Sequence, residues 1–170
     1  MKKRTGMTGK RISGSEINFT LSPRLNAAGR MGDAGKALDL LMTDAFDMAR
    51  KLAAELEENN NSRREIEQKV FDQAFELASQ RVEDGACSIG LFEECHPGVI
   101  GIVASRLVRI FNRPTILFTR FGDKLKGSGR STEHINLYEM IANCKFVESF
   151  GGHKGAAGLS ILPKNLNNFI

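Results

Sequence analysis

A long helical pattern between residues 34 and 81 places the strongest constraint on how this chain folds. Apolar residues recur there at spacings of three and four, which puts them on one stripe of an α-helix. The first half of the stripe is formed by Leu38, Leu41, Ala45, Met48, Leu52 and Leu56. The second half is formed by Ile66, Val70, Ala74 and Leu77. Residues 57–65 between them are polar on every side, so the stripe has a gap in its middle.

The gap decides which kind of helix this is. A coiled-coil helix needs a continuous apolar stripe, and this one fails in the middle. A helix with two apolar ends and a polar centre can instead join two bodies across solvent. As one helix it would be roughly 50 Å long. We therefore predict a connector helix over residues 33–83, with two positions for a break left open, at residues 42–44 and at residues 59–61.

Strands and helices alternate after the connector. A buried strand, a mostly apolar helix and a second buried strand are predicted at residues 86–92, 97–111 and 115–119. A strand, a helix and a strand within about 35 residues form a βαβ unit, whose two strands are parallel. A turn at residues 122–124 leads to further elements, a strand, a short amphipathic helix and a last strand, at residues 125–131, 135–144 and 156–162. The predicted fold class is α/β: a long connector helix followed by a mixed, mainly parallel β-sheet flanked by helices.

Three segments follow from these patterns. Residues 1–32 are a lead-in, residues 33–83 are the connector, and residues 84–170 are a domain whose last helix is unfinished. The chain is therefore expected to be cut at both ends, as a fragment or as a truncated gene product.

Composition narrows the class of protein. The chain is 41% hydrophobic and 26% charged, as in ordinary soluble domains, and no apolar run reaches the 18 or so residues of a membrane span. Its three cysteines show no Cys-x-x-Cys spacing, which fits a reducing, cytoplasmic location. A net charge of +4 favours a nucleic-acid partner only weakly. With no tryptophan and one tyrosine, any stacking platform for bases would have to use phenylalanine.

A glycine-rich stretch at residues 149–159 is the first candidate site. Glycines allow positive φ and close approach of the backbone to a ligand, and successive backbone N–H groups can form an anion-binding concavity. Gly152, His153 and Lys154 would lie in that concavity and could hold a phosphate. A tight turn between two buried elements explains the glycines equally well, and composition alone does not separate the two interpretations.

Two further candidates follow predicted strands. His96 precedes Pro97 and so stands at a helix cap, where free N–H groups and the helix dipole attract anions. Arg130 and Ser131 end another strand. Ligands of βαβ sheets favour the carboxyl ends of strands, which predicts one shared cleft for these residues. A structural or surface role is the alternative for each histidine. No clustered carboxylates or histidines suggest a metal hydrolase centre, so neither catalytic nor metal-binding residues are predicted.

Four motifs in order, and the helical connector that follows the first of them, resemble the RecJ family of single-strand-specific DNA exonucleases, in the DHH phosphoesterase superfamily. Residues 19–31 are similar to the end of its phosphoesterase domain, and residues 33–81 to the helix that joins its two core domains. The other three stretches resemble the marker motifs of the DHH-associated C-terminal domain, and they are residues 96–107, 127–131 and 151–158. The resemblance runs from about Lys10 to the end of the chain.

The resemblance implies a two-domain enzyme that degrades single-stranded DNA from its 5′ end in repair and recombination. Mn²⁺ or Mg²⁺ would be held by a phosphoesterase domain that this sequence lacks, and the domain seen here would close the other side of the cleft. Carried over by residue, Arg130, Ser131 and His153 would contact phosphate near the metals. His96 and Arg106 would line the same groove, and Arg30 would approach it from the tail of the first domain. Alone, the chain is expected to hold the strand weakly without cleaving it.

Other interpretations of the function stay open. Alanyl-tRNA synthetases and oligonucleotide phosphodiesterases carry similar C-terminal domains, so the ligand could be tRNA or a short oligonucleotide. The chain could also be a non-catalytic nucleic-acid-binding module or a truncated remnant. The arginines of residues 24–30 and the long connector favour the exonuclease.

Overall fold

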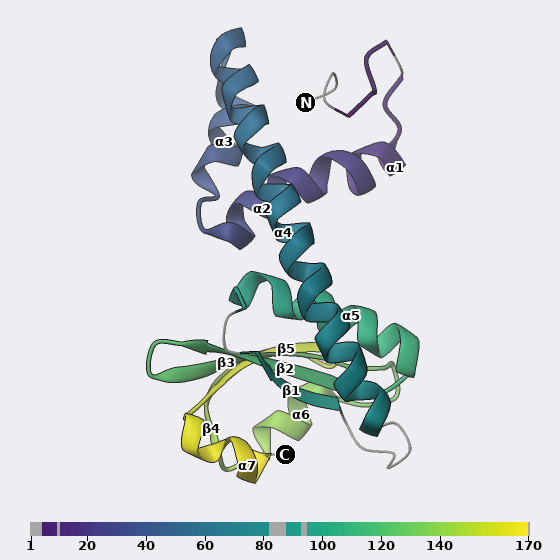
Figure 1. Ribbon diagram of the computed structural model, residues 1–170, viewed down its shortest axis with the longest axis vertical. Coiled ribbons are helices and arrows are strands. Elements are labelled where there is room, and N and C mark those ends of the chain that lie inside the picture. The colour runs from purple at the N-terminus through teal and green to yellow at the C-terminus, as the bar shows by residue number, and fades with distance from the viewer. Residues whose placement is uncertain (1–4, 10, 82–87, 93–94, 170) are drawn as a thin grey trace. The chain divides into compact units, whose positions relative to one another are not determined.

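The computed structural model describes residues 5–9, 11–81, 88–92 and 95–169 (Figure 1). It divides into two compact units, Met1–Glu65 and Ile66–Ile170. The basic start of the chain, the last two residues of the predicted connector and the first two residues of the strand predicted after it lie outside the described residues. No helix among the described residues is long and apolar enough to cross a membrane.

The first unit is helical. Its elements are α1 (Gly14–Glu16), the π-helical turn η1 (Ile17–Leu21), α2 (Ser22–Met31), α3 (Gly35–Met42) and the first part of α4 (Phe46–Arg81). The chain leaves helical geometry between Met42 and Phe46, at the first of the two breaks left open by the sequence. At the second position α4 is continuous.

Partners within the first unit account for several polar residues in the centre of α4 and next to it. Glu57 pairs with Arg24 of α2 at 2.6 Å, and Glu55 pairs with Lys36 of α3 at 2.8 Å. Asn60 is only 2% exposed and accepts a hydrogen bond from Arg63. Several polar residues of this stretch therefore contact their own unit.

The second unit is built around a five-stranded sheet in the order β1-β2-β3-β5-β4. The strands are β1 (Ser88–Phe92), β2 (Thr115–Phe121), β3 (Lys124–Arg130), β4 (Val147–His153) and β5 (Ala156–Ile161). The sheet is mixed, as predicted, and β1 and β2 form the predicted parallel pair. The prediction of a mainly parallel sheet is wrong, because the pairs β2–β3, β3–β5 and β4–β5 are all antiparallel.

Short turns account for the antiparallel pairs. Only Gly122 and Asp123 separate β2 from β3, and only Lys154 and Gly155 separate β4 from β5. Two residues can join antiparallel strands, whereas parallel strands need a long crossover. The glycine-rich stretch is therefore the end of a β-hairpin. Its first half belongs to strand β4, which was not predicted from the sequence.

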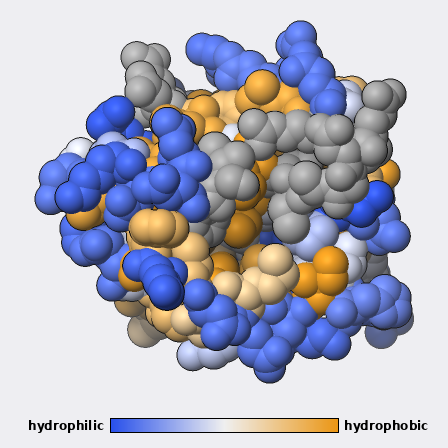
Figure 2. Space-filling model, turned by 90° about the horizontal axis from the view of Figure 1, so that it is seen from below, coloured by the Kyte–Doolittle hydropathy of each residue, from blue (hydrophilic) through white to orange (hydrophobic). Residues whose placement is uncertain are grey.

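Helices cover the two faces of this sheet differently (Figure 1). Helix α5 (Pro97–Phe111) packs on β2 and β3, with the second half of α4 also contributing to the core on its side. Helix α6 (Leu137–Ala142) packs beneath the other face, where a second core gathers Phe118, Leu125, Leu137, Ile141, Leu159 and Ile161. The 3₁₀ turn η2 (Pro163–Asn165) and α7 (Leu166–Phe169) follow β5. Seen from below, hydrophilic residues cover most of the visible surface, with apolar residues in patches between them (Figure 2).

Candidate nucleic-acid interface

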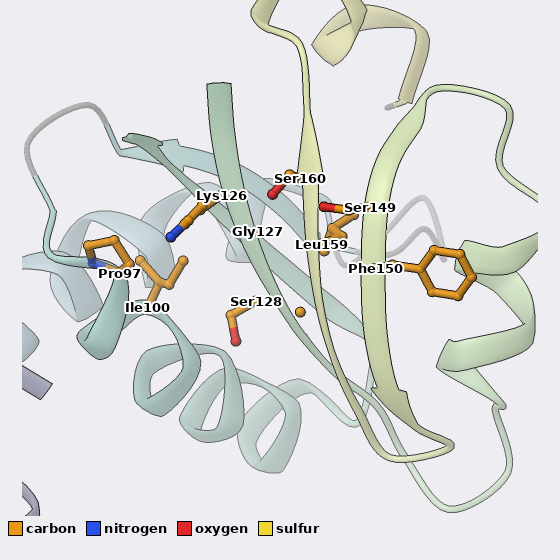
Figure 3. Close-up of a pocket in the computed structure, with 10 residues that line it drawn as sticks. Pro97, Ile100, Lys126, Gly127, Ser128, Ser149, Phe150, Leu159 and Ser160 are labelled. Atoms are coloured by element: carbon orange, nitrogen blue, oxygen red, sulfur yellow. The ribbon is translucent and has the colours of Figure 1, made fainter. Parts of the chain in front are cut away.

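A groove lies on the α5 side of the sheet, where β5 and β4 extend beyond the helix. It encloses about 370 Å³, and we call it the sheet groove. Its lining comes from α5, β3, β5 and β4, and comprises Pro97, Ile100, Lys126, Gly127, Ser128, Ser149, Phe150, Gly158, Leu159 and Ser160. Figure 3 shows Pro97, Ile100 and Lys126 on one side of it, Ser149 and Ser160 on the strands opposite, and the Phe150 ring pointing away.

Small residues form the floor of the groove. Strand register aligns Ser128 with Gly158 and Gly158 with Gly151, across three neighbouring strands. A Cβ added to Gly158 would have its nearest neighbour 4.0 Å away, and one added to Gly151 would have none within 4 Å. The space above these glycines is therefore open, and a ligand can come close to the backbone there.

Lys126 supplies positive charge at one end of the groove. Lys126 is exposed, and its Nζ lies 3.6 Å from the ring centroid of Phe121 on the adjacent strand. Lys126 pairs in register with Ser160 of β5, so its charge lies beside the hydroxyl groups that line the groove.

Arg130 lies further along the same face of β3. Its guanidinium donates to Ser128 Oγ at 3.0 Å and to the Gly129 carbonyl at 2.7 Å. A Cβ on Gly101 of α5 would lie 2.7 Å from Arg130 Nη2, so glycine at this position makes room for the guanidinium. The guanidinium is thus held against the helix beside Ser128, which lines the groove.

The tip of the β4–β5 hairpin is fastened next to Arg130. The Ser131 N–H donates to the Gly155 carbonyl at 3.0 Å, and the Leu137 N–H donates to the Lys154 carbonyl at 3.0 Å. The Ser131 hydroxyl oxygen is buried and has no hydrogen-bond partner within the described protein. Ser131 therefore holds the hairpin through its backbone, and its side chain would have to move before it could contact a phosphate.

His153 and Gly152 occupy that hairpin. His153 is exposed, and its Nδ1 accepts a hydrogen bond from the Gly155 N–H at 3.2 Å, which fixes the ring orientation. His153 pairs with Ala156, which pairs with Arg130, so His153 and Arg130 share one row of the sheet. Gly152 has φ +146°, and a Cβ there would lie 2.3 Å from the Ala156 carbonyl oxygen. Gly152 is thus needed for the backbone path, and Lys154 is exposed at the turn.

His96 caps α5 as predicted, but at the other end of the strands. Its Nδ1 accepts from the Gly98 N–H at 3.1 Å. It follows the end of β1 that pairs with Thr119, whereas Arg130 pairs with Thr115. Those two rows are about 13 Å apart at 3.3 Å per residue. The expectation that His96 and Arg130 meet at the carboxyl ends of strands is wrong, because β3 runs antiparallel to β2.

The two remaining candidates belong to other elements, Arg106 to α5 and Arg30 to α2 of the first unit. The Arg106 guanidinium pairs with Glu67 of α4 at 3.3 Å and stacks 3.6 Å over the Phe71 ring, so it joins α5 to α4. Arg30 belongs to α2 in the first unit and is partly exposed. The structure brings together Arg130, Ser131, Gly152, His153 and Lys154, and it gives Arg106 partners elsewhere.

The residues that line the groove were not predicted as site residues. Lys126, Ser128, Ser149 and Ser160 were not singled out, although Lys124, Lys126, Ser128 and Arg130 alternate with small or apolar residues. Alternation with a period of two places such residues on one face of a strand, so this signal could have found the β3 side of the groove. Ser149 and Ser160 carry no comparable signal.

Metal-ligating side chains do not cluster in the part of the chain that the structure describes. No three or more His, Cys, Asp or Glu residues there are grouped so that they could hold a metal ion.

Comparison with known proteins places this arrangement in context. The model of the DHHA1 domain family matches residues 71–170. The single-stranded-DNA-specific exonuclease RecJ of Bacillus subtilis is 39% identical over 88% of this chain and 20% of its own length. Its Escherichia coli counterpart is 39% identical over 89% of this chain and 28% of its own length.

Solved structures agree on the fold. The crystal structure of RecJ from Thermus thermophilus in complex with Mg²⁺ matches 99% of this chain with a TM-score of 0.87 and 33% identity, over 26% of the longer protein. A second structure, of exonuclease RecJ bound to manganese, matches with a TM-score of 0.85 and 34% identity over 41% of its length. These matches confirm the predicted helix and mixed sheet flanked by helices. The chain spans less than half of each of these relatives.

Proposed function

The chain belongs to the DHHA1 domain family, and we propose that it is the strand-holding part of a single-stranded-DNA-specific exonuclease. The observation that carries this proposal is the sheet groove, an open surface floored by glycine and serine with Lys126 and Arg130 along one strand. The likeness of the chain to RecJ proteins named for their action on single-stranded DNA supports the choice of ligand.

The chemistry of the groove suits a sugar–phosphate backbone. Phosphate contacts by lysine and arginine supply most of the sequence-independent affinity for nucleic acid. Serine hydroxyls and backbone groups add hydrogen bonds to phosphate and sugar without reading sequence. In our proposal Lys126 and Arg130 contact phosphates, His153 contacts the strand at the hairpin, and Gly158 lets the backbone approach the sheet.

The same proposal includes the reaction, the metals and the biological role. The groove would hold DNA against a phosphoesterase domain that uses Mn²⁺ or Mg²⁺ and degrades the strand from its 5′ end, in cytoplasmic DNA repair and recombination. The relatives solved with Mg²⁺ and with manganese support the choice of metals. The residues described here would bind and orient the strand.

Binding of a labelled single-stranded oligothymidylate to the chain, followed by fluorescence anisotropy at several salt concentrations, tests the proposal. We expect log affinity to fall linearly with log salt, with a slope of about −0.7 per phosphate contact. Arg130→Ala and His153→Ala should weaken binding. The matched controls Arg109→Ala, on the exposed side of α5, and His134→Ala, before α6, should not.

Equal loss of affinity in the test variants and their controls would overturn the assignment to the groove. Tighter binding of an RNA oligomer or of a duplex than of single-stranded DNA would overturn the choice of ligand. Absence of any salt-dependent binding would overturn the function as a whole.

A further inference from the structure

An exposed phenylalanine stands at the tip of the β2–β3 hairpin. Phe121 is the last residue of β2, and it is 53% exposed. It pairs with Lys124 across a turn of two residues. Large apolar side chains are usually buried, and packing against the core does not account for the position of this ring.

Lys126 holds the ring in place. Its Nζ lies 3.6 Å from the ring centroid, within the range of a cation–π interaction. Both residues lie on the α5 face of the sheet, because Phe121 is two residues beyond Thr119, the register partner of Lys126. The ring is therefore oriented by a cation while more than half of the residue stays in water.

Lys126 connects the ring to the sheet groove. Lys126 contacts Phe121 and also lines the groove, as Figure 3 shows for its position beside Ile100. Arg130 lies four residues further along β3, about 13 Å away at 3.3 Å per residue. A nucleic-acid strand lying along β3 would thus have Arg130 near one end of its path. The Phe121 ring would lie beyond the other end.

We propose that Phe121 is a stacking platform for one unpaired base of the single-stranded nucleic acid in the groove, with Lys126 contacting the adjoining phosphate. Sequence-independent binders of single strands combine a positively charged groove with aromatic side chains on which bases stack. The proposal rests on the proposed function of the groove and adds a specific base contact to it.

Two aromatic rings on the opposite side of the sheet contact each other. Tyr138 and Phe150 contact each other in a tilted arrangement with ring centroids 5.2 Å apart, on the α6 side. Neither ring is presented to the groove, which leaves Phe121 as the ring that we assign to base stacking.

The test compares two strands of equal length and charge. One carries bases throughout, and the other has abasic sites along its whole length. Phe121→Leu should bind the base-bearing strand about five- to a hundredfold more weakly than the unmodified chain and bind the abasic strand equally well. The matched control Phe75→Leu, which removes an exposed ring from α4, should change neither affinity.

A second variant gives a direct signal. The chain has no tryptophan, so Phe121→Trp places a single indole at the proposed platform. We expect retained affinity, and quenching of its fluorescence by the base-bearing strand but not by the abasic strand.

The outcomes separate the two proposals. Equal affinity of Phe121→Leu and the unmodified chain for the base-bearing strand, or an unquenched Phe121→Trp in the bound state, overturns the stacking platform and leaves the groove intact. Failure of the unmodified chain to bind either strand overturns the groove itself, and the platform with it. Equal weakening of both strands by Phe121→Leu also overturns stacking, because a base contact cannot act on an abasic strand.

Discussion

Strand β3 presents different residues to its two sides. Leu125, Gly127 and Gly129 face α6 and are buried, with Leu125 only 1% exposed. Lys126 and Ser128 face the other way and line the sheet groove. Both faces come from seven consecutive residues, so the period of two in a strand assigns stability to one set and recognition to the other.

The glycines of the two faces show the same division. A Cβ on Gly127 would lie 2.6 Å from the Phe118 ring, and one on Gly129 would lie 2.7 Å from Leu137. Those glycines make room for core side chains. Gly158 and Gly151 have open space above them. One residue type thus serves packing on the α6 face and ligand access on the α5 face.

The largest expected effect comes from emptying the α6 face. Phe118 is 0% exposed, and Phe118→Ala should lower the free energy of unfolding by about 3–5 kcal/mol, since it removes buried apolar surface and leaves a cavity. Urea unfolding followed by the fluorescence of Tyr138, the single tyrosine, measures it. A loss below about 1 kcal/mol would mean that this face is not the stabilising one.

The α5 side of the sheet also has a buried core, and Cys95 belongs to it. Burial raises the pKa of the Cys95 thiol from 9.0 to about 11. The thiolate fraction at pH 8 is then about a hundredfold smaller than that of an ordinary cysteine, and alkylation should be slower by a similar factor. In a Cys87→Ser background, the partly exposed Cys144 is the internal reference.

The same shift predicts a pH dependence of stability. Between pH 9 and 11 the folded thiol keeps its proton while the unfolded thiol ionises. The free energy of unfolding therefore falls as pH rises through this window. Cys95→Ala should make the fall shallower. Equal alkylation rates for Cys95 and Cys144 would show that the region under α5 is open to solvent.

A matched pair of glycine substitutions compares the faces directly. Gly127→Ala should cost about 1–3 kcal/mol of unfolding free energy, because the added methyl overpacks the core against Phe118. Gly158→Ala should stay within about 0.5 kcal/mol but weaken binding of single-stranded DNA, because its methyl projects into the groove. Urea unfolding and anisotropy on both variants measure this. The reverse pattern would contradict the division of the two faces.

Local patterns in the sequence predicted much of this fold. The stripe from Leu38 to Leu77 predicted helix, and the strand–helix–strand pattern predicted the parallel pair β1–β2. The direction of β3 could also have been predicted, because a turn of only Gly122 and Asp123 can join antiparallel strands but not parallel ones. Strand β4 was harder to predict. Its burial does not alternate, since all its residues after Val147 are exposed.

The site was predicted less completely, because its geometry depends on contacts distant in sequence. Arg130 and His153 were named from their motifs, and the sheet register places them in one row. Nothing near Arg106 in the sequence indicates its pairing with Glu67, 39 residues earlier. The groove itself arises because α5 packs on β2 and β3 and leaves β5 and β4 open, which no single segment encodes.

The smallest expected change in stability is at Lys126, and this substitution tests the groove side of β3 directly. Lys126→Gln should leave the free energy of unfolding within about 0.5 kcal/mol, since the side chain is exposed. It should make the salt dependence of DNA binding shallower by about 0.7, the value of one phosphate contact on a single strand. Lys164→Gln, an exposed lysine in η2, changes the net charge equally and should leave the slope unchanged. If both variants shift the slope by the same amount, overall charge rather than the groove attracts the strand; if only Lys126→Gln does so, the open face of β3 contacts the phosphates.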